Sequence, residues 1–255
     1  MNPEAQILIA PSDHWISEPL LFTEDLNKAF DYSSKMEELM TFGIHPTQPN
    51  KGYGYHKVSD SIKSVYKVLE FTEKPSFSLA QQFLSSGNFL WNSGIFVWGA
   101  KTIVKAFQTK QAEMYDVFSQ GINLLNTPFE QEFMNDNYQK AENISIDYAI
   151  MEQSDNVSVV KANFKWNDLG TWSALCDQID KDGDDNAAVN VIPHFENVKG
   201  NMVFSSSKKL VLLKGLEDYI VVDDEDVLMI YLRKNDQDIK LLLNDIKSKH
   251  GDQFD

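Results

Sequence analysis

Residues 7–14 read Ile-Leu-Ile-Ala-Pro-Ser-Asp-His, an apolar run that ends at a polar turn. A continuous apolar run of this length is typical of a strand buried on both faces, and such strands lie in the middle of parallel sheets. A helix with Ser17 as its N-cap should follow. Further strands are expected at residues 39–44, 62–71, 89–98 and 157–160, and further helices at residues 77–84, about 100–120 and about 128–152. This alternation predicts an α/β domain built on a mostly parallel sheet.

The pattern of the sequence changes after Asp180, from alternating strands and helices to short β-type runs. Residues 181–186 form a charged segment that contains a glycine, and short β-type runs follow it. These runs lie at residues 189–192, 201–205, 210–213, 219–222 and 227–231, and an amphipathic helix is expected at residues 239–246. We therefore expect two domains, at residues 1–180 and 181–255, of which the second is a small all-β unit with a closing helix.

The chain of 255 residues carries a formal net charge of −15 and a single arginine, Arg233. Nucleic-acid binding draws its affinity from cationic side chains that displace counterions, so this charge argues against a nucleic-acid partner. Bidentate guanidinium contacts with phosphate are also unavailable to most of the chain. An anionic substrate would instead need lysine side chains, backbone N–H groups or Mg²⁺ to offset the negative field.

The sequence contains one cysteine, Cys176, so no intramolecular disulfide can form. Residues 1–10 do not resemble a signal peptide, and no run approaches the roughly 18 apolar residues of a membrane span. These features predict a cytoplasmic protein without a membrane partner.

Two aspartates, Asp13 and Asp168, each follow a predicted strand. In open α/β sheets, ligands bind beyond the carboxyl ends of the strands. Two carboxylates at one sheet edge could therefore hold Mg²⁺, which binds one or two carboxylates together with substrate phosphates. The residue pattern leaves the plainer interpretation, an aspartate in a turn, open for each of them.

Three further segments could contact a ligand. Pro75 biases Lys74 toward an extended conformation, which could aim Glu73 and Lys74 into a cleft, although the two could also be an ordinary surface ion pair. The Gly-Tyr-Gly-Tyr segment at residues 52–55 could let backbone approach a ligand closely or could be a plain hairpin turn. Asn92 interrupts an aromatic strand and needs a hydrogen-bond partner, either a ligand hydroxyl or a neighbouring strand.

Several short motifs occur in a particular order along the chain. This order identifies a protein family more specifically than any single motif does. They are found at residues 10–14, 42–47, 52–55, 71–75, 90–96, 145–152, 166–172 and 215–222. In this order they resemble the mannose-1-phosphate guanylyltransferase family, and the resemblance covers nearly the whole chain.

The resemblance implies a Rossmann-like, GT-A-like nucleotidyltransferase domain with a mixed α/β sheet, followed by a small C-terminal β-helix-like unit. It implies transfer of GMP from GTP to mannose 1-phosphate, giving GDP-mannose and pyrophosphate, with Mg²⁺ as cofactor. By similarity, Asp13 and Asp168 would bind the metal and, together with Lys74, support catalysis. The substrate would contact Gly54, Tyr55, Glu73, Lys74, Asn92, Asp147 and Gly170.

One part of the family pattern does not occur in this sequence. The family opens with a strand, a glycine-rich loop that bears an arginine, and a Pro-Lys element, which together hold GTP. We therefore expect a fragment that lacks the first βαβ part of its domain, forms no GDP-mannose by itself, and forms a homodimer or pairs with a missing N-terminal piece. Two other functions stay open. One is a non-catalytic sugar-phosphate-binding or regulatory subunit, and the other is a different sugar-nucleotide enzyme, such as another sugar-1-phosphate nucleotidyltransferase (for example one for glucose 1-phosphate) or a metal-dependent glycosyltransferase.

Overall fold

The computed structural model of the protein describes residues 2–62 and 64–251, and the chain divides into two compact units. Unit 1 comprises residues 1–12 and 16–166, and unit 2 comprises residues 13–15 and 167–255. The boundary lies between Trp166 and Asn167, earlier than the expected division after Asp180. The reason is that helix α6 (Trp172–Cys176) buries Cys176 in the core of unit 2.

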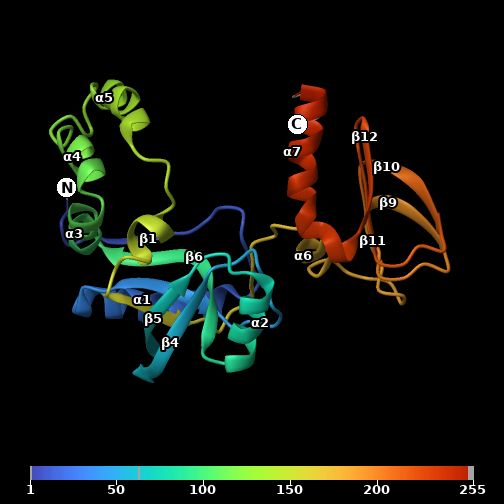
Figure 1. The fold of residues 1–255 in the computed structure, drawn as a ribbon, viewed down its shortest axis with the longest axis horizontal. Coiled ribbons are helices and arrows are strands. Elements are labelled where there is room, and N and C mark those ends of the chain that lie inside the picture. The colour runs from blue at the N-terminus through green and yellow to red at the C-terminus, as the bar shows by residue number, and fades with distance from the viewer. Residues whose placement is uncertain (1, 63, 252–255) are drawn as a thin grey trace. The chain divides into compact units, whose positions relative to one another are not determined.

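A six-stranded sheet forms the centre of unit 1 (Figure 1), with strand order β1-β6-β3-β7-β5-β4 and an additional pairing of β6 with β4. Strands β3 and β7 are parallel, whereas the other neighbouring pairs are antiparallel. The strands are β1 (Gln6–Ile9), β3 (Leu39–Ile44), β4 (Tyr55–Ile62), β5 (Val65–Thr72), β6 (Phe89–Gly99) and β7 (Val157–Lys161). The sheet is mixed, as the resemblance implied, and the expectation of a mostly parallel sheet is wrong. A short connection such as the one between β4 and β5 can join only antiparallel strands.

Strand β1 lies at the edge of this sheet and pairs antiparallel with β6. Its Leu8 and Ile9 side chains are 39% and 48% exposed. The prediction of a central strand buried on both faces is therefore wrong, because within residues 2–62 and 64–251 β1 has a sheet neighbour on one side only.

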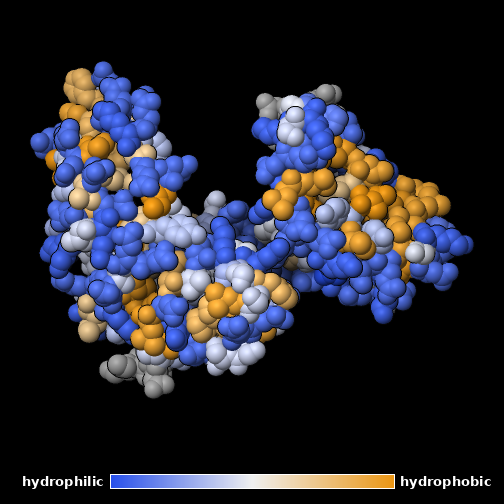
Figure 2. Space-filling view, in the orientation of Figure 1, coloured by the Kyte–Doolittle hydropathy of each residue, from blue (hydrophilic) through white to orange (hydrophobic). Residues whose placement is uncertain are grey.

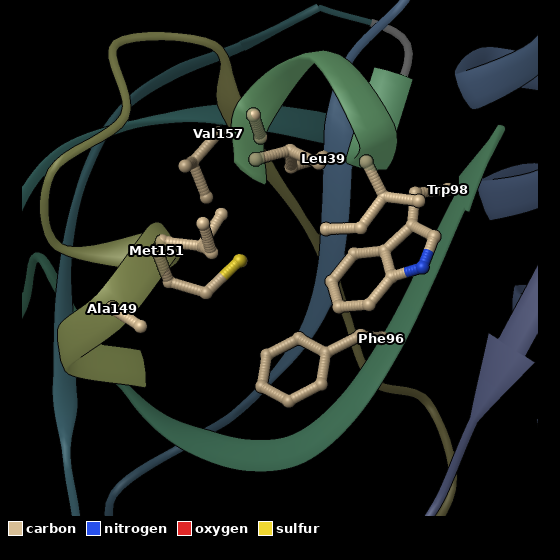
Figure 3. Packing of buried hydrophobic residues seen from close by; sticks show 9 residues of the cluster. Leu39, Phe96, Trp98, Ala149, Met151 and Val157 are labelled. Atoms are coloured by element: carbon tan, nitrogen blue, oxygen red, sulfur yellow. The ribbon is translucent and has the colours of Figure 1, made fainter. Parts of the chain in front are cut away.

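Helices cover both faces of the sheet, and the alternation of side chains along β3 and β6 shows how. Met40 and Val97 pack with Ala29 of α1 (Pro19–Met36) in one cluster. Leu39 and Trp98, each one residue away, pack in a second cluster with α3 (Ala100–Lys110) and with η2, a π-helical turn at residues 147–151 (Figure 3). Successive strand residues point to opposite faces, so both faces of the sheet are buried.

Two helix predictions need correction. Helix α1 begins after Glu18, which makes no side-chain capping bond, so Ser17 is not its N-cap; the Ser17 hydroxyl donates to Glu18 Oε2 at 2.7 Å instead. The expected helix over residues 128–152 is interrupted. It consists of α5 (Glu130–Asn137), a 3₁₀ turn (Tyr138–Lys140) and η2 (Asp147–Met151).

The remaining helices of unit 1 lie where the sequence predicts helix, although the helix expected over about residues 100–120 is divided in two at Gln111. Helix α2 (Phe77–Ser86) begins at Ser76, whose hydroxyl accepts a bond from Leu79 N, and ends at Gly87 with φ of 72°. Helix α4 (Ala112–Ser119) follows α3 after Gln111. The left-handed conformation at Gly87 is the one that glycine adopts without steric cost at a helix end.

Unit 2 contains a four-stranded sheet with strand order β12-β11-β10-β9. Its strands are β9 (Ala187–Glu196), β10 (Met202–Lys214), β11 (Tyr219–Asp224) and β12 (Val227–Leu232). A 3₁₀ turn (Arg233–Asp238) leads into α7 (Ile239–His250). Strands β9, β10 and β11 pair in parallel, and β12 is antiparallel to β11. The expected all-β unit with a closing helix is present, whereas the description as β-helix-like stays a prediction.

A column of buried asparagines ties successive turns of this sheet together. Asn201 donates from Nδ2 to Asn186 Oδ1 at 2.9 Å, and its own Oδ1 accepts from Tyr219 N at 2.9 Å. Both asparagines are almost fully buried. Their side chains satisfy backbone groups of the turns that would otherwise be buried without partners.

The sheet of unit 2 also carries exposed apolar side chains, seen as orange surface over β9 to β12 in Figure 2. They are Ile192, Leu210, Leu212, Leu228 and Ile230, each more than half exposed. Among the described residues, none of the helices combines the length and the apolar character that crossing a membrane requires.

Candidate active site

Three residues from neighbouring segments of unit 1 lie in a row across β5, β4 and β6. Gly54, directly before β4, is the middle one: its carbonyl accepts a hydrogen bond from Asn92 N at 2.8 Å. On its other side is Glu73, which directly follows β5. A Cβ atom built on Gly54 would lie 2.3 Å from Glu73 Oε2 and 3.0 Å from the Phe71 ring. Gly54 therefore leaves a hollow in the sheet surface that the Glu73 carboxylate partly occupies.

Asp147 joins this row from the first residue of η2. Asn92 Nδ2 donates a hydrogen bond to Asp147 Oδ1 at 2.8 Å. The other side of the same carboxamide, Asn92 Oδ1, accepts from Thr41 Oγ1 at 3.3 Å and from Gly94 N at 3.2 Å. These three bonds orient the amide with its N–H groups toward Asp147.

The two carboxyl groups of the site are harder to ionise than ordinary acids. Burial raises the pKa of Glu73, and the neighbouring Asp147 charge raises it further. Burial also raises the pKa of Asp147, and the hydrogen bond from Asn92 opposes part of that shift. Two acids with raised pKa values at one hollow are typical of a binding or catalytic site, because burial and like charge are tolerated there for function.

Lys74 is the cation of this group. Its Nζ lies 3.5 Å from Glu73 Oε1, and its side chain is 64% exposed. Its backbone has φ of 45°, in the left-handed region, rather than the extended conformation predicted before Pro75. An exposed ammonium beside two half-buried carboxylates can meet an anionic group while the carboxylates accept hydroxyl hydrogen bonds.

The site formed by Gly54, Glu73, Lys74, Asn92 and Asp147 is called the unit 1 site below. It unites five of the residues proposed from the sequence. Tyr55 does not join it, because successive strand residues point to opposite faces. The Tyr55 side chain is fully buried, and its hydroxyl bonds the backbone N and O of Asn50 at 2.9 and 3.0 Å.

The other predicted residues, Asp13, Asp168 and Gly170, belong to unit 2. Asp13 is exposed and precedes β2 (Trp15–Ile16) by two positions; Asp168 is half-buried and directly follows β8 (Trp166–Asn167). Strands β2 and β8 pair as a two-stranded sheet. Asp168 Oδ1 accepts from Gly170 N at 3.0 Å, and a Cβ on Gly170 would lie 2.8 Å from Asp168 Oδ2. The missing side chain of Gly170 thus lets the Asp168 carboxylate fold back over its own turn.

The direction of the two-stranded sheet decides which ends of its strands are adjacent. Ser17 N, just after β2, donates to Lys165 O, just before β8, at 3.4 Å. The end of β2 therefore lies beside the start of β8, and the start of β2 beside the end of β8. Asp13 shortly precedes the start of β2, and Asp168 directly follows the end of β8, so both residues are next to this second pair of strand ends.

The donor set of these two aspartates suits Mg²⁺, which prefers carboxylate oxygens and takes its remaining ligands from water and substrate phosphates. No group of three or more His, Cys, Asp or Glu side chains in the described part of the chain is arranged to hold a metal ion by protein ligands alone.

Sequence reasoning missed two residues next to the unit 1 site. His56 is fully buried on the same face as Gly54, two positions along β4, and Thr41 of β3 is fully buried beneath Asn92. The alternation of strand residues could have found His56. It was missed because residues 52–55 were interpreted as a turn, so no strand was expected to follow.

The fold and the site define a class: an enzyme domain of mixed α/β architecture that holds acidic and basic side chains above one face of its sheet. The sequence pattern described as "Nucleotidyl transferase" matches residues 1–185. The chain belongs to this nucleotidyl transferase family, a family of transferase enzymes.

Individual relatives agree with this assignment. Mannose-1-phosphate guanylyltransferase of Escherichia coli is 29% identical over 97% of this chain and 53% of its own length. The alginate biosynthesis protein AlgA of Pseudomonas aeruginosa is 31% identical over 95% of this chain and 51% of its own length. The chain thus spans about half the length of these relatives.

A solved structure has a similar fold. A Thermus thermophilus protein described as a mannose-1-phosphate geranyltransferase superimposes with a TM-score of 0.82, at 22% identity, over 95% of this chain and 70% of the other. This likeness supports the nucleotidyltransferase fold of the chain.

Proposed function

We propose that this chain contributes the sugar-phosphate side of an enzyme that transfers GMP from GTP to mannose 1-phosphate, giving GDP-mannose and pyrophosphate. The observation that carries the proposal is the unit 1 site, in which Asn92 bonds Asp147 beside Glu73 and Lys74. The ordered sequence motifs and the names of the relatives support mannose 1-phosphate as the sugar phosphate.

In this reaction, a phosphate oxygen of mannose 1-phosphate forms a bond to the α-phosphorus of GTP. The bond from that phosphorus to the bridging β-phosphate oxygen breaks, and pyrophosphate leaves with the electron pair. No covalent enzyme intermediate is needed, so positioning and electrostatic stabilisation supply the rate.

The residues of the unit 1 site have distinct tasks in this proposal. Glu73 and Asp147 accept hydrogen bonds from sugar hydroxyls, and the remaining N–H of Asn92 donates one. Lys74 is exposed and can pair with the phosphate of the sugar. The hollow at Gly54 lets the sugar approach the backbone closely.

Asp13 and Asp168 would hold Mg²⁺, which would offset the negative charge that gathers on the phosphates. Gly170 would support this task by leaving room for the Asp168 carboxylate. The formal net charge of −15 makes such an offset necessary for anionic substrates.

The glycine-rich loop that the resemblance associates with GTP does not occur in residues 1–255. We propose that a further segment supplies it, either from a longer form of the protein or from a partner, and that the activity is cytoplasmic. A non-catalytic sugar-phosphate-binding subunit is the alternative, since the unit 1 site needs no such loop to bind a sugar phosphate.

Isothermal titration calorimetry with mannose 1-phosphate tests the binding proposal directly. Heat of binding at millimolar ligand is expected for the chain, with weaker binding of glucose 1-phosphate. The absence of any heat with mannose 1-phosphate would contradict both the enzyme and the binding subunit.

An activity assay separates these two functions. The chain alone, with GTP, Mg²⁺ and mannose 1-phosphate, should form no GDP-mannose. Addition of an N-terminal segment that carries the glycine-rich loop of a relative should restore formation of GDP-mannose. Binding without restored activity would instead favour the non-catalytic subunit.

A further inference from the structure

His56 lies two residues after Gly54, next to the unit 1 site, and takes no part in the proposed contacts with the sugar phosphate. It is the second residue of β4 and pairs with Phe71 of β5 and Leu90 of β6. Its side chain is fully buried, and its ring centroid lies 4.9 Å from that of Phe71. His56 is therefore held in a defined place, on the same face of the sheet as Gly54 and two residues along the chain from it.

Both ring nitrogens of His56 are buried, and neither has a hydrogen-bond partner among the described residues. Burial lowers the pKa of His56 to about 4, and the nearby Asn92 carboxamide opposes part of that shift. At neutral pH the ring is uncharged, with one N–H donor and one acceptor nitrogen. A buried donor without a partner destabilises a fold, so its presence beside a binding site calls for an explanation.

The oxygen of the Asn92 carboxamide lacks a strong hydrogen-bond donor, which the N–H group of His56 could supply. Thr41 Oγ1 lies 3.3 Å from Asn92 Oδ1, but it lies 3.1 Å from the carbonyl oxygen of Ile95 as well. A hydroxyl has one hydrogen, so Thr41 cannot donate fully to both acceptors. The other donor to Asn92 Oδ1, Gly94 N, is at 3.2 Å, which is long for an N–H to oxygen bond.

The orientation of this carboxamide matters because of Asp147. With Nδ2 toward Asp147, the amide donates to a carboxylate at 2.8 Å. With the amide turned over, two oxygens would face each other, and the site would lose a donor. The hydrogen-bond donors to Asn92 Oδ1 therefore decide whether the carboxamide presents its N–H groups or its oxygen to Asp147 and to a ligand.

We propose that His56 is a positioning residue for Asn92, whose Oδ1 takes a hydrogen bond from the neutral imidazole both with and without a bound sugar phosphate. A small rotation of the ring or of the carboxamide makes this bond. It fixes Asn92 Nδ2 toward Asp147 and toward the ligand, and it gives the buried ring its missing partner. This inference rests on the proposed function of the unit 1 site as a sugar-phosphate site.

The substitution His56→Phe tests the proposal. Phenylalanine keeps the ring and its contact with Phe71 but removes both nitrogens. The affinity for mannose 1-phosphate, measured by calorimetry, should fall about tenfold, the effect of one lost hydrogen bond. The midpoint of thermal unfolding should not fall, because two unpartnered buried nitrogens are removed.

Two further variants make the result specific. His56→Gln keeps an N–H donor at the end of its side chain, and its affinity should return to within about threefold of the unchanged protein. His194→Phe makes the same change at an exposed histidine of unit 2 and should leave the affinity unchanged. An affinity of His56→Phe equal to that of the unchanged protein would overturn the proposal. The proposal would also be overturned if His56→Phe and His56→Gln lost the same amount of affinity and both lowered the midpoint of thermal unfolding equally, since that pattern indicates a packing role.

A readout without ligand separates this inference from the proposed function. The side-chain amide signals of Asn92 in a ¹⁵N-resolved NMR spectrum, assigned by their loss in Asn92→Asp, should shift in His56→Phe. If the unchanged protein binds no mannose 1-phosphate but this shift occurs, the proposed function fails and the positioning role stands. If the Asn92 signals do not move, the positioning role fails, whatever the protein binds.

Discussion

Asn92 of β6 donates a hydrogen bond from Nδ2 to Asp147 Oδ1 at 2.8 Å, across 55 positions of sequence. This bond joins the central sheet of unit 1 to the π-helical turn η2. It brings the carboxylate of Asp147 close enough to Glu73 for the charge of Asp147 to raise the pKa of Glu73 further. The unit 1 site depends on this connection more than on any other single contact.

Substitution of Asn92 should weaken sugar-phosphate binding. Asn92→Ala removes the donor to Asp147 and leaves a half-buried carboxylate without it, so the affinity for mannose 1-phosphate should fall at least about tenfold. Calorimetry measures the change. Asn135→Ala, on the exposed face of α5, is the matched control and should bind normally. Normal binding by Asn92→Ala would contradict the assignment of the site.

Substitution of Gly54 should cost both stability and binding. In Gly54→Ala the new methyl group would lie 2.3 Å from Glu73 Oε2 and 3.0 Å from Phe71, so one of these groups must move. The free energy of unfolding should fall by about 1–3 kcal/mol, the usual cost of overpacking. Urea unfolding measures it.

Two comparisons accompany this measurement. Gly183→Ala adds the same methyl group where no atom lies within 4 Å and should change the stability little. The double variant Gly54→Ala with Glu73→Ala removes the closest clash and should be destabilised less than the sum of the two single changes. Strict additivity would mean that Gly54 and Glu73 do not contact each other in solution.

The raised pKa values of Glu73 and Asp147 predict a pH dependence of stability. Both acids hold protons more tightly in the folded chain than in the unfolded chain, whose values are 4.5 for glutamate and 3.8 for aspartate. As the pH rises from these unfolded values through the raised folded values, the folded state must release protons that the unfolded state has already lost. Their contribution to the free energy of unfolding therefore decreases as the pH rises through that window.

Glu73→Gln isolates the contribution of one acid. The variant should be more stable relative to the unchanged protein at pH 7 than at pH 4, because glutamine cannot ionise. Urea unfolding at several pH values measures this difference. A Glu73→Gln difference that is constant from pH 4 to pH 7 would contradict the raised pKa of Glu73.

The proposed metal site can be tested by Mn²⁺ as a spectroscopic substitute for Mg²⁺. In the presence of GDP-mannose, electron paramagnetic resonance should detect Mn²⁺ bound to the chain. Asp13→Asn or Asp168→Asn should weaken this binding at least about tenfold, since each removes one of two charged ligands. Asp180→Asn, outside the two strand ends, should have no effect. Equal Mn²⁺ affinity in all four proteins would exclude Asp13 and Asp168 as ligands.

Much of the fold follows from the sequence because its signals are local. The helix expected at residues 77–84 matches α2 to within two residues, and the apolar runs predict β3 and β7 equally well. Strand direction and order are not local. The run at residues 7–10 looks like a central strand, yet only tertiary pairing decides that β1 has one neighbour.

The residues of the candidate site also differ in whether local sequence signals could predict them. Glu73, Lys74 and Asn92 could be proposed from motifs, since each interrupts or ends a strand. The importance of His56 as a positioning residue could not, because it arises from the deficit of hydrogen bonds around Asn92 Oδ1, and that deficit involves Thr41 of a neighbouring strand as well as Gly94 of the same strand. Tyr55 shows the opposite case: it lies within a motif, but the pleat of β4 turns it away from Gly54.

Residues 13–15 group with unit 2, although residues on both sides of them belong to unit 1. No single cut of the polypeptide can therefore release either unit intact. A product that stops at Trp166 would carry three residues of the other unit, and one that starts at Asn167 would lack them. Preparing the C-terminal unit by itself would require grafting residues 13–15 onto its front through a linker, as in a circularly permuted gene.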